Sequence, residues 1–557
     1  MVLTLATWLH GGYAFGVWPQ LAPLENALRL GHGLEGDWYT AHPAPHWLFA
    51  HAAALVPEAW LAPVFAAAWL AGVAFFWAGF AALGSDLAIP GGAILAGGLI
   101  GARTAFAGLG SMSLLTPFLY PSNLACVGWL FALREAFRGR AAGAGLAAGL
   151  AMLLQPLVGL LTLVTAGIVL LRTARAGAAV RFAAVALIVG GFALARLVAD
   201  LGSSAGVTAR ERFELLAIVR LPHHLVYRAF RPEEYVMVAL WALVLAVGMA
   251  RYRPAHEDGV GRTAGWTVLL DSIVMLCLAG AIASSLGWPL VLVELQTARA
   301  SAWIPLLGLL AAAAALARSR PWTGTLALLA VPALAEALWP PLRPALERVG
   351  LGALPRHALQ APVILALVLA IPILSARTGR ADATAPGRLR GIGATAIAAA
   401  LVVLGFVASG WHGPPKPAVD LDWRDIAAQA RGLSKPSDQF LTPPDLDGFR
   451  FYSHRPIVVD FGQIAHGDLA GWRDRMNAVT GDAGVLAPSP EPTASREARI
   501  ASAYDRVAPS APELVRRYGV RYVVARRAAL PALPVWAEPV ASNATYVLLK
   551  VRSWIFE

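Results

Sequence analysis

The sequence predicts an α-helical polytopic membrane protein with about 13 transmembrane helices, followed by a C-terminal extracytoplasmic α/β domain. Its 557 residues are 57% hydrophobic and only 14% charged. In an average soluble protein about a quarter of the residues are charged. Apolar runs that span or nearly span a bilayer recur up to about residue 410, where the composition becomes that of a soluble domain. We therefore divide the chain into a transmembrane domain, 1–411, and a soluble domain, 412–557.

The apolar runs are the expected transmembrane helices. They lie at 1–17, 58–84, 88–106, 115–135, 141–154, 157–172, 178–200, 235–251, 264–284, 302–317, 323–339, 358–376 and 391–410. Pro156 divides the stretch 141–172, and a proline can either end a helix or kink it. By hydropathy alone this stretch is therefore two short spans or one kinked helix.

The distribution of arginine predicts the topology. Lysine occurs only at 416, 435 and 550, so arginine supplies most of the positive charge behind the net +11. Many arginines lie in short gaps between apolar runs, which is typical of cytoplasmic loops and not of nucleic-acid binding. They alternate correctly only if 141–172 crosses twice. The N-terminus is then cytoplasmic, and the outer segments are 18–57, 107–114, 201–234, 285–301, 340–357 and everything after 411.

The soluble domain shows alternating strand and helix patterns. We expect strands at 439–442, 449–452, 457–461, 520–525 and 546–551, with helices near 467–478, 495–507 and 511–518. A further amphipathic helix begins near Asp422, with Asp420 or Asp422 as its cap. This order predicts a small α/β domain. It contains no phosphate-binding glycine motif, so we expect no nucleotide cofactor.

Polar residues that could bind a substrate or take part in catalysis gather in the predicted outer loops. The loop Gln20–Trp47 carries Glu35 and Asp37, and the loop 201–234 carries Arg220, His223, His224 and Arg228. A third loop, 285–301, carries Gln296 and Arg299. Arginine binds phosphate oxygens through two parallel hydrogen bonds, and a carboxylate can accept a proton from an attacking hydroxyl. This combination suits chemistry on an anionic, lipid-linked substrate.

Each of these residues also has a structural interpretation. Asp37 can cap a helix in a solvated loop, and outer-loop arginines often contact headgroups or carboxylates. Adjacent histidines point in different directions on most backbones, so His223 and His224 are a poor chelate by spacing, and a divalent metal stays an alternative. Cys126 and Cys277 both lie in apolar runs and are expected to be inert thiols.

The order of several short motifs resembles the GT-C class of integral-membrane glycosyltransferases, in a bacterial branch related to oligosaccharyltransferases, protein mannosyltransferases and aminoarabinose transferases. The matching stretches are 12–16, 36–39, 220–224, 296–299, 448–455, 459–460, 472–475 and 518–524. The resemblance touches both halves of the chain. Two departures are the lack of a second acid paired with Asp37, apart from Glu35, and the lack of the oligosaccharyltransferase W-W-D-Y-G type motif, which disfavours peptide asparagine as acceptor.

The resemblance implies a membrane glycosyltransferase that moves a sugar from a polyprenyl-phosphate-linked donor to an extracytoplasmic acceptor. Asp37 would be the general base of an inverting reaction, and Arg220, His223, His224 and Arg299 would be donor-site residues. Arg228, Gln296 and Glu35 complete the predicted substrate-binding set. The implied location is the bacterial inner membrane. The partners are then the lipid bilayer, the donor and a glycan, lipid or protein acceptor, with no nucleic acid.

Two other classes of function compete with this one. A transporter or flippase for a lipid-linked glycan would show paired halves with broken helices and charges near mid-membrane. The sequence has no such halves, and its charges lie at the outer surface. A catalytically inactive cell-envelope scaffold of the same fold is the second alternative, because the predicted chemistry depends on a single carboxylate.

The topology can be tested with reporter fusions. Alkaline phosphatase is active only outside the cytoplasm, so we expect activity for a fusion after residue 411 and none for a fusion near residue 385. The reverse pattern would contradict both the orientation and the external site.

Overall fold

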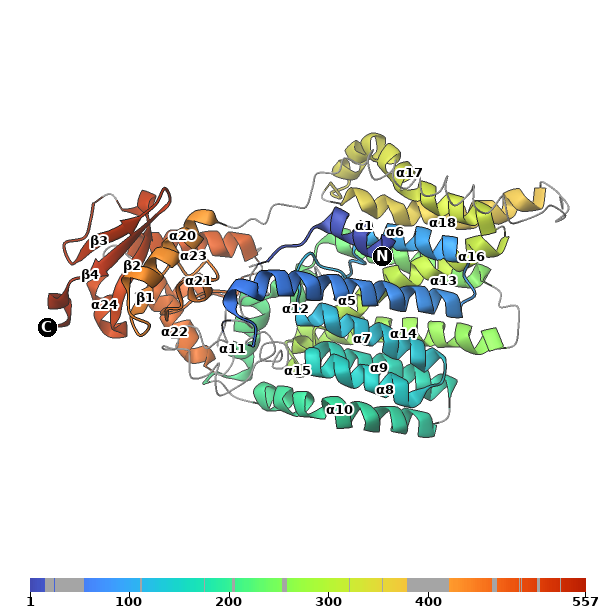
Figure 1. The fold of residues 1–557 in the computed structure, drawn as a ribbon, viewed down its shortest axis with the longest axis horizontal. Coiled ribbons are helices and arrows are strands. Elements are labelled where there is room, and N and C mark those ends of the chain that lie inside the picture. Colours follow the sequence, from blue (N-terminus) through green and yellow to red (C-terminus); the bar gives the residue numbers. More distant parts are fainter. Residues whose placement is uncertain are drawn as a thin grey trace.

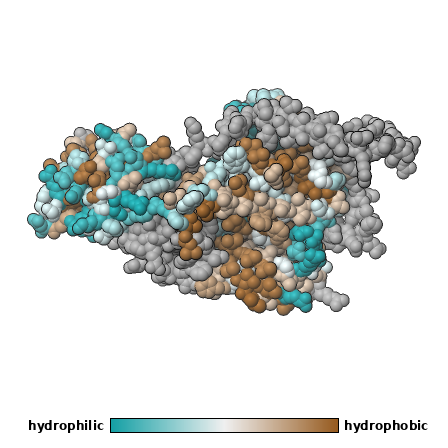
Figure 2. All heavy atoms as spheres, in the orientation of Figure 1, coloured by the Kyte–Doolittle hydropathy of each residue, from teal (hydrophilic) through white to brown (hydrophobic). Residues whose placement is uncertain are grey.

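The computed structural model describes residues 1–15, 25, 55–110, 113–174, 176–202, 206–252, 258–319, 321–352, 354–377, 420–462, 468–489, 491, 493–507, 511–530 and 532–557. These residues form a bundle of apolar helices with an α/β domain at one end (Figure 1). On the face seen in Figure 2, hydrophobic residues predominate on the bundle, and hydrophilic residues gather on the α/β domain.

The bundle helices coincide with the apolar runs of the sequence. They are α1 (Val2–Gly11), α5 (Glu58–Asp86), α6 (Gly91–Thr104), α7 (Pro121–Phe137), α8 (Ala141–Leu154), α9 (Pro156–Thr173), α10 (Ala176–Gly202), α13 (Pro232–Arg251), α14 (Asp258–Leu286), α16 (Trp303–Ser319), α17 (Pro321–Arg348) and α18 (Gln360–Arg377). The thirteenth expected span, 391–410, lies outside the described residues. Seven helical stretches in the described ranges are long and apolar enough to cross a membrane. The chain is therefore a multi-pass membrane protein, and the total of 13 crossings stays a prediction.

The stretch 141–172 forms two helices that fold back on each other. They meet at Gln155, whose backbone is extended (φ −153°, ψ 101°) and whose side chain accepts a hydrogen bond from Val158 N at 3.0 Å. The helices approach so closely that a Cβ on Gly159 would lie 2.4 Å from Met152 Cα. A single kinked helix is therefore the wrong alternative, and Pro156 is the first residue of α9, where its missing amide proton costs nothing.

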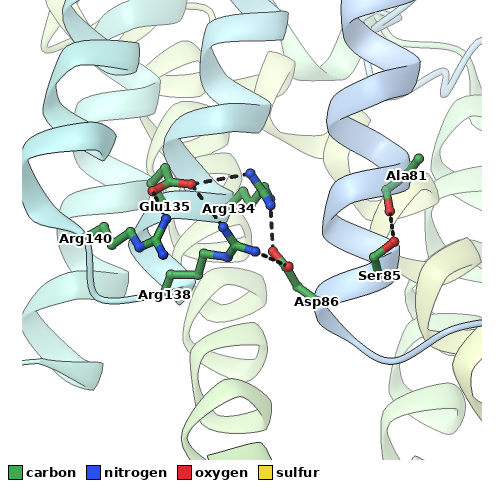
Figure 3. A network of polar contacts seen from close by, with 7 residues as sticks. All are labelled: Ala81, Ser85, Asp86, Arg134, Glu135, Arg138 and Arg140. Atoms are coloured by element: carbon green, nitrogen blue, oxygen red, sulfur yellow. Dashed lines mark hydrogen bonds and ion pairs between the residues drawn. The ribbon is translucent and has the colours of Figure 1, made fainter.

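An ion-pair network holds together the bundle end that lies away from the α/β domain (Figure 3). Asp86, the last residue of α5, accepts hydrogen bonds from Arg134 at 2.9 Å and Arg138 at 2.5 Å. Glu135 contacts the same two arginines and Arg140, at 3.5 to 3.7 Å. Five charged residues from α5, α7 and the turn before α8 thus neutralise one another almost completely.

The α/β domain is built on a four-stranded sheet of order β1-β2-β4-β3. The strands are β1 (Gln439–Leu441), β2 (Val520–Arg526), β3 (Ala537–Ser542) and β4 (Tyr546–Val551). Strand β1 is parallel to β2, and the other two pairings are antiparallel. The main helices are α20 (Leu421–Leu433), α22 (Leu469–Thr480), α23 (Thr493–Val507) and α24 (Pro512–Tyr518), and the predicted cap Asp420 accepts a hydrogen bond from Trp423 N at 3.1 Å.

Apolar side chains cover both faces of the sheet. Tyr522 and Val524 of β2 pack with Trp423 of α20, whereas Val523 packs with Trp472 of α22. Alternate residues of β2 thus enter different apolar clusters, as the period of a β-strand requires.

Two of the five strand predictions for this domain are wrong, and one strand was missed. The segment 449–452 is helical, α21 (Phe449–Ser453), because Gly448 (φ 83°) turns the chain and the helix buries Arg450 beside Asp460 at 2.7 Å. The segment 457–461 makes only an isolated parallel bridge, between Ile457 and Phe440. Strand β3 was missed because it is an exposed edge strand that contains a proline and an irregular register.

The α/β domain is docked on the bundle through apolar and ionic contacts. Leu215, Leu216 and Val219, from the segment between α10 and α13, lie in the same apolar cluster as Trp472. Three carboxylates of the bundle side also contact the domain. Glu25 accepts a hydrogen bond from Phe451 N at 3.1 Å, Glu58 pairs with Arg431 at 3.2 Å, and Glu211 pairs with Arg473 at 3.2 Å.

Replacing Asp86 should destabilise the bundle. Asp86→Asn removes the nearer of the two carboxylates that contact Arg134 and Arg138, while both arginine side chains stay mostly buried. We expect a loss of about 1.5–3 kcal/mol, the usual contribution of a hydrogen bond to a charged group. Thermal unfolding of the detergent-solubilised protein measures it. The control Glu347→Gln breaks the exposed pair between Arg343 and Glu347 and should change nothing measurable; equal melting temperatures for both variants would contradict the role of the network.

Candidate functional site

An irregular segment enters the interior of the bundle between α6 and α7. Helix α6 has 14 residues, a length of about 21 Å, which is shorter than the ~30 Å hydrocarbon core. Just beyond its end, Phe106 packs against Phe76 and Phe80 in the C-terminal half of α5, with ring centroids 5.8 and 6.2 Å apart, and its side chain is fully buried. Irregular backbone inside a membrane bundle is tolerated only where it is buried in protein or lines a cavity.

A second irregular segment meets the first. It contains α15 (Leu290–Glu294) and the 3₁₀ helix η3 (Thr297–Ala302), which lead into α16. Ser301 accepts a hydrogen bond from Leu109 N at 2.7 Å and donates one to Ala298 O at 2.6 Å. Gly108 allows this approach, because a Cβ there would lie 2.5 Å from Ala302 N. Gly280 of α14 allows a different one, because a Cβ there would clash with Thr297 Oγ1 of the second segment.

Arg299 projects from the second segment. Its Nε donates to Gln296 Oε1 at 2.5 Å, and among the described residues its two terminal nitrogens have no hydrogen-bond partner. Gln296 has left-handed backbone (φ 54°, ψ 50°), which is strained for a residue other than glycine and is found most often at functional sites. The predicted pair Gln296 and Arg299 therefore forms one unit, in which the glutamine orients the guanidinium.

His224 reaches the first segment. It lies on the short helix α12 (Pro222–Leu225), and its Nδ1 donates to Gly110 O at 2.8 Å. The carbonyl can only accept, so Nδ1 carries the proton. The amide of Gly110 donates in turn to Glu234 Oε2 at 2.8 Å, at the start of α13. Gly110 (φ 68°) thus links His224 to Glu234.

Positive charge dominates the surroundings of the histidines. Arg299 lies within electrostatic reach of His224 and Tyr120, and Arg220 lies within reach of both histidines. Burial, followed by the charge of Arg220, lowers the pKa of His223 to about 4. Burial, followed by the neighbouring His223, lowers the pKa of His224 to about 3. Both imidazoles are therefore neutral at pH 7, and Arg299 carries the positive charge available to an anionic ligand.

The other predicted site residues fall into three groups. Arg220 is buried against the α/β domain, where its Nε and Nη2 donate to Gly462 O at 3.2 and 2.7 Å. Arg228 is exposed in the short 3₁₀ helix η2 (Tyr227–Ala229). Glu35 and Asp37 lie outside the described residues, so their roles stay predictions.

Sequence reasoning missed the residues that join the segments. Gly108, Gly110 and Gly280 resemble ordinary glycines of apolar runs, and Glu234 resembles an acid that favours a helix N-terminus. The pair of glycines around Leu109 was the available signal, because glycine in an apolar run can mark a close backbone approach. Within the described ranges, no group of three potential ligands could hold a metal ion.

Comparisons with known proteins give a limited match. A protein-family model described as a domain of unknown function (DUF6798) matches residues 421–479, in the α/β domain. No curated protein matches the chain. Two solved structures of the arabinofuranosyltransferase AftD from Mycobacteria, one of them a mutant, are similar over 99% of this chain, at 14% and 15% identity and TM-scores of 0.44 and 0.48. The match covers 39% and 41% of those chains, about two fifths of their length, and similarity at this level establishes neither a shared activity nor a shared substrate.

The neutral histidines predict an acid-sensitive fold. An unfolded histidine has a pKa near 6.5, well above the folded value of about 3 for His224, so between these pH values the unfolded chain binds protons that the folded chain does not. The free energy of unfolding therefore falls as the pH falls, and for His224 the loss between pH 8 and pH 5 is at most about 2 kcal/mol.

We expect His224→Gln to reduce the drop in melting temperature between pH 8 and pH 5. The glutamine amide can still donate to Gly110 O but does not titrate. The control His357→Gln removes a histidine elsewhere, so an equal change in both variants would show that the effect is not specific to His224. An unchanged pH dependence in His224→Gln would mean that folding does not lower the pKa of His224.

Proposed function

We propose that this protein is a GT-C-like membrane glycosyltransferase that moves a sugar from a polyprenyl-phosphate-linked donor to an extracytoplasmic acceptor. The observation that carries the proposal is Arg299. Its two terminal nitrogens have no partner among the described residues, and the side chain is held by Gln296 where two irregular segments meet inside a membrane bundle. An arginine built in this way is suited to a phosphate that enters from the bilayer.

Arg299 would act on the phosphate that leaves the sugar. Negative charge grows on this phosphate as the glycosidic bond breaks, so a fixed cation stabilises the transition state more than the ground state. The orientation by Gln296 matters because a preorganised group needs no rearrangement during the reaction. His223 and His224 are neutral, and in this proposal they contribute hydrogen bonds and shape. A bound phosphate would raise their pKa, since it adds negative charge nearby.

Asp37 would be the general base. It would take the proton of the acceptor hydroxyl on the face of the sugar opposite the phosphate, and the reaction would invert the anomeric carbon. Glu25 is the described part of the same outer loop, and it is buried against Phe451 and Arg450 of the α/β domain. Glu25 thus lies between the bundle and the domain, on the side that we propose to be extracytoplasmic.

The two alternatives have less support. A flippase would use charged groups within its spans; the pair between Arg103 of α6 and Glu336 of α17 neutralises itself at 2.9 Å, and Glu25, Glu58 and Glu211 face the α/β domain. An inactive scaffold would not require the strained backbone of Gln296, or terminal nitrogens of Arg299 that have no partner among the described residues.

Two substitutions separate the proposed roles. Arg299→Ala should weaken the binding of polyprenyl phosphate and also lower the rate of sugar transfer. Asp37→Asn should lower transfer by at least about a hundredfold, because a general base typically contributes that much or more, while phosphate binding stays the same. Binding is measured with polyprenyl phosphate alone, which is common to donors with any sugar, and transfer is measured with a labelled lipid-linked sugar.

Arg343→Ala is the matched control, because Arg343 is exposed and pairs only with Glu347 in the described part of the chain. It should leave both binding and transfer at the wild-type level. Normal transfer by Asp37→Asn would make Glu35 or Glu25 the next candidate base. Normal phosphate binding by Arg299→Ala would contradict the donor site itself.

A further inference from the structure

One segment connects the interior of the α/β domain to the candidate site. It consists of α11 (Ala209–Phe213), the π-helix η1 (Glu214–Arg220) and α12, without a break longer than Leu221. Leu215, Leu216 and Val219 are buried in the apolar cluster of the α/β domain. A π-helix is rare and often marks a functional position. Here it sits between a domain core and the pair His223 and His224.

Arg220, the last residue of η1, makes the polar connection. Its Nε and Nη2 both donate to Gly462 O, and its guanidinium lies over the ring of Phe461 with 5.2 Å between Cζ and the ring centroid. The side chain is buried. Phe461 is in turn held by a hydrogen bond from its amide to Pro444 O at 2.6 Å. The carbonyl of Gly462 and the ring of Phe461 therefore hold the guanidinium of Arg220 in the α/β domain, and we call these two residues the Arg220 seat.

A short chain of backbone hydrogen bonds links this seat to His224. Leu221 N donates to Leu216 O, and His224 N donates to Leu221 O, both at 3.0 Å. The imidazole of His224 then donates to Gly110 O. A shift of Arg220 would therefore move His224 relative to Gly110 and to the first irregular segment.

We propose that Arg220 is a positioning residue, through which the α/β domain holds His223 and His224 in place in the site. The expected effect of Arg220 on kcat rests on the proposed function. Its expected effect on the position of His224 rests on the contacts alone. The sequence predicted that Arg220 binds the donor, but two of its nitrogens donate to Gly462 O. In this proposal Arg299, whose terminal nitrogens have no partner among the described residues, binds the donor instead. The α/β domain thus contributes to the site without touching the donor phosphate.

The test compares two variants of the seat with two controls in the full-length, detergent-solubilised protein. Arg220→Lys keeps the charge but cannot make two hydrogen bonds to one carbonyl in this geometry. Phe461→Leu removes the ring below the guanidinium and leaves Gly462 in place. Arg473→Lys weakens a different contact between the domain and the bundle, the pair with Glu211, and Arg210→Lys changes an exposed arginine of α11.

The first measurement is amide hydrogen exchange of residues 221–230, which needs no substrate. We expect exchange about five- to thirtyfold faster in Arg220→Lys, a smaller increase in Phe461→Leu, and wild-type rates in both controls. Unchanged exchange in Arg220→Lys would overturn the inference. Equal acceleration in Arg473→Lys would also overturn it, because docking of the domain in general would then be responsible.

The second measurement is the rate of transfer. A misplaced His224 should lower kcat of Arg220→Lys by about ten- to a hundredfold, with the KM for the donor within about twofold of the wild type. A raised KM with unchanged kcat would overturn the inference, since Arg220 would then bind the donor phosphate. If the wild type transfers no sugar, the proposed function fails, and the exchange experiment still decides the role of Arg220.

Discussion

Backbone amides and carbonyls inside a bilayer have no water to bond, and the architecture around the candidate site depends on this constraint. Two segments that are not regular helices enter the bundle, and one hydrogen bond joins them, from Leu109 N to Ser301. Polar groups of the first segment also bond to other elements: Gly110 bonds Glu234 of α13 and His224 of α12. A side chain at Gly108 would clash where the two segments meet, and one at Gly280 would clash where α14 meets the second segment. An irregular backbone in this environment is costly, which is why a functional role is its natural explanation.

The electrostatic character of the region follows from the same packing. Arginine stays charged when buried, whereas imidazole loses its proton, so the cluster of four basic residues separates into charged guanidiniums and neutral histidines. Arg220 and Arg299 then differ in what they bind. Arg220 donates to a carbonyl of the α/β domain, and Arg299 is oriented by Gln296 with its terminal nitrogens directed at no group in the described structure. Arg220 and Arg299 have the same side chain, and they differ in what they can bind only because their partners differ.

The α/β domain is joined to the bundle by more than a linker. It shares an apolar cluster with the segment before α12, and it receives carboxylates from three separate bundle segments, Glu25, Glu58 and Glu211. Contacts spread over so many segments favour one fixed arrangement of domain and bundle. The site is consequently a property of the whole chain, although most of its residues come from the bundle.

The sequence by itself determined that this is a multi-pass membrane protein, and where most of its helices lie. Hydropathy was enough for this, because it reflects the bilayer and not tertiary contacts. It also singled out Gln296, Arg299 and the histidine pair as polar residues in loops that it predicts to face outward. It could not determine that 449–452 is helical, since the burial of Arg450 against Asp460 overrides the alternating pattern. Nor could it assign Arg220 to the α/β domain, or join Gly110 to Glu234 and His224, because these contacts link residues more than a hundred positions apart. Only the tertiary structure decided which of these polar residues bond one another, and that the terminal nitrogens of Arg299 have no partner among the described residues.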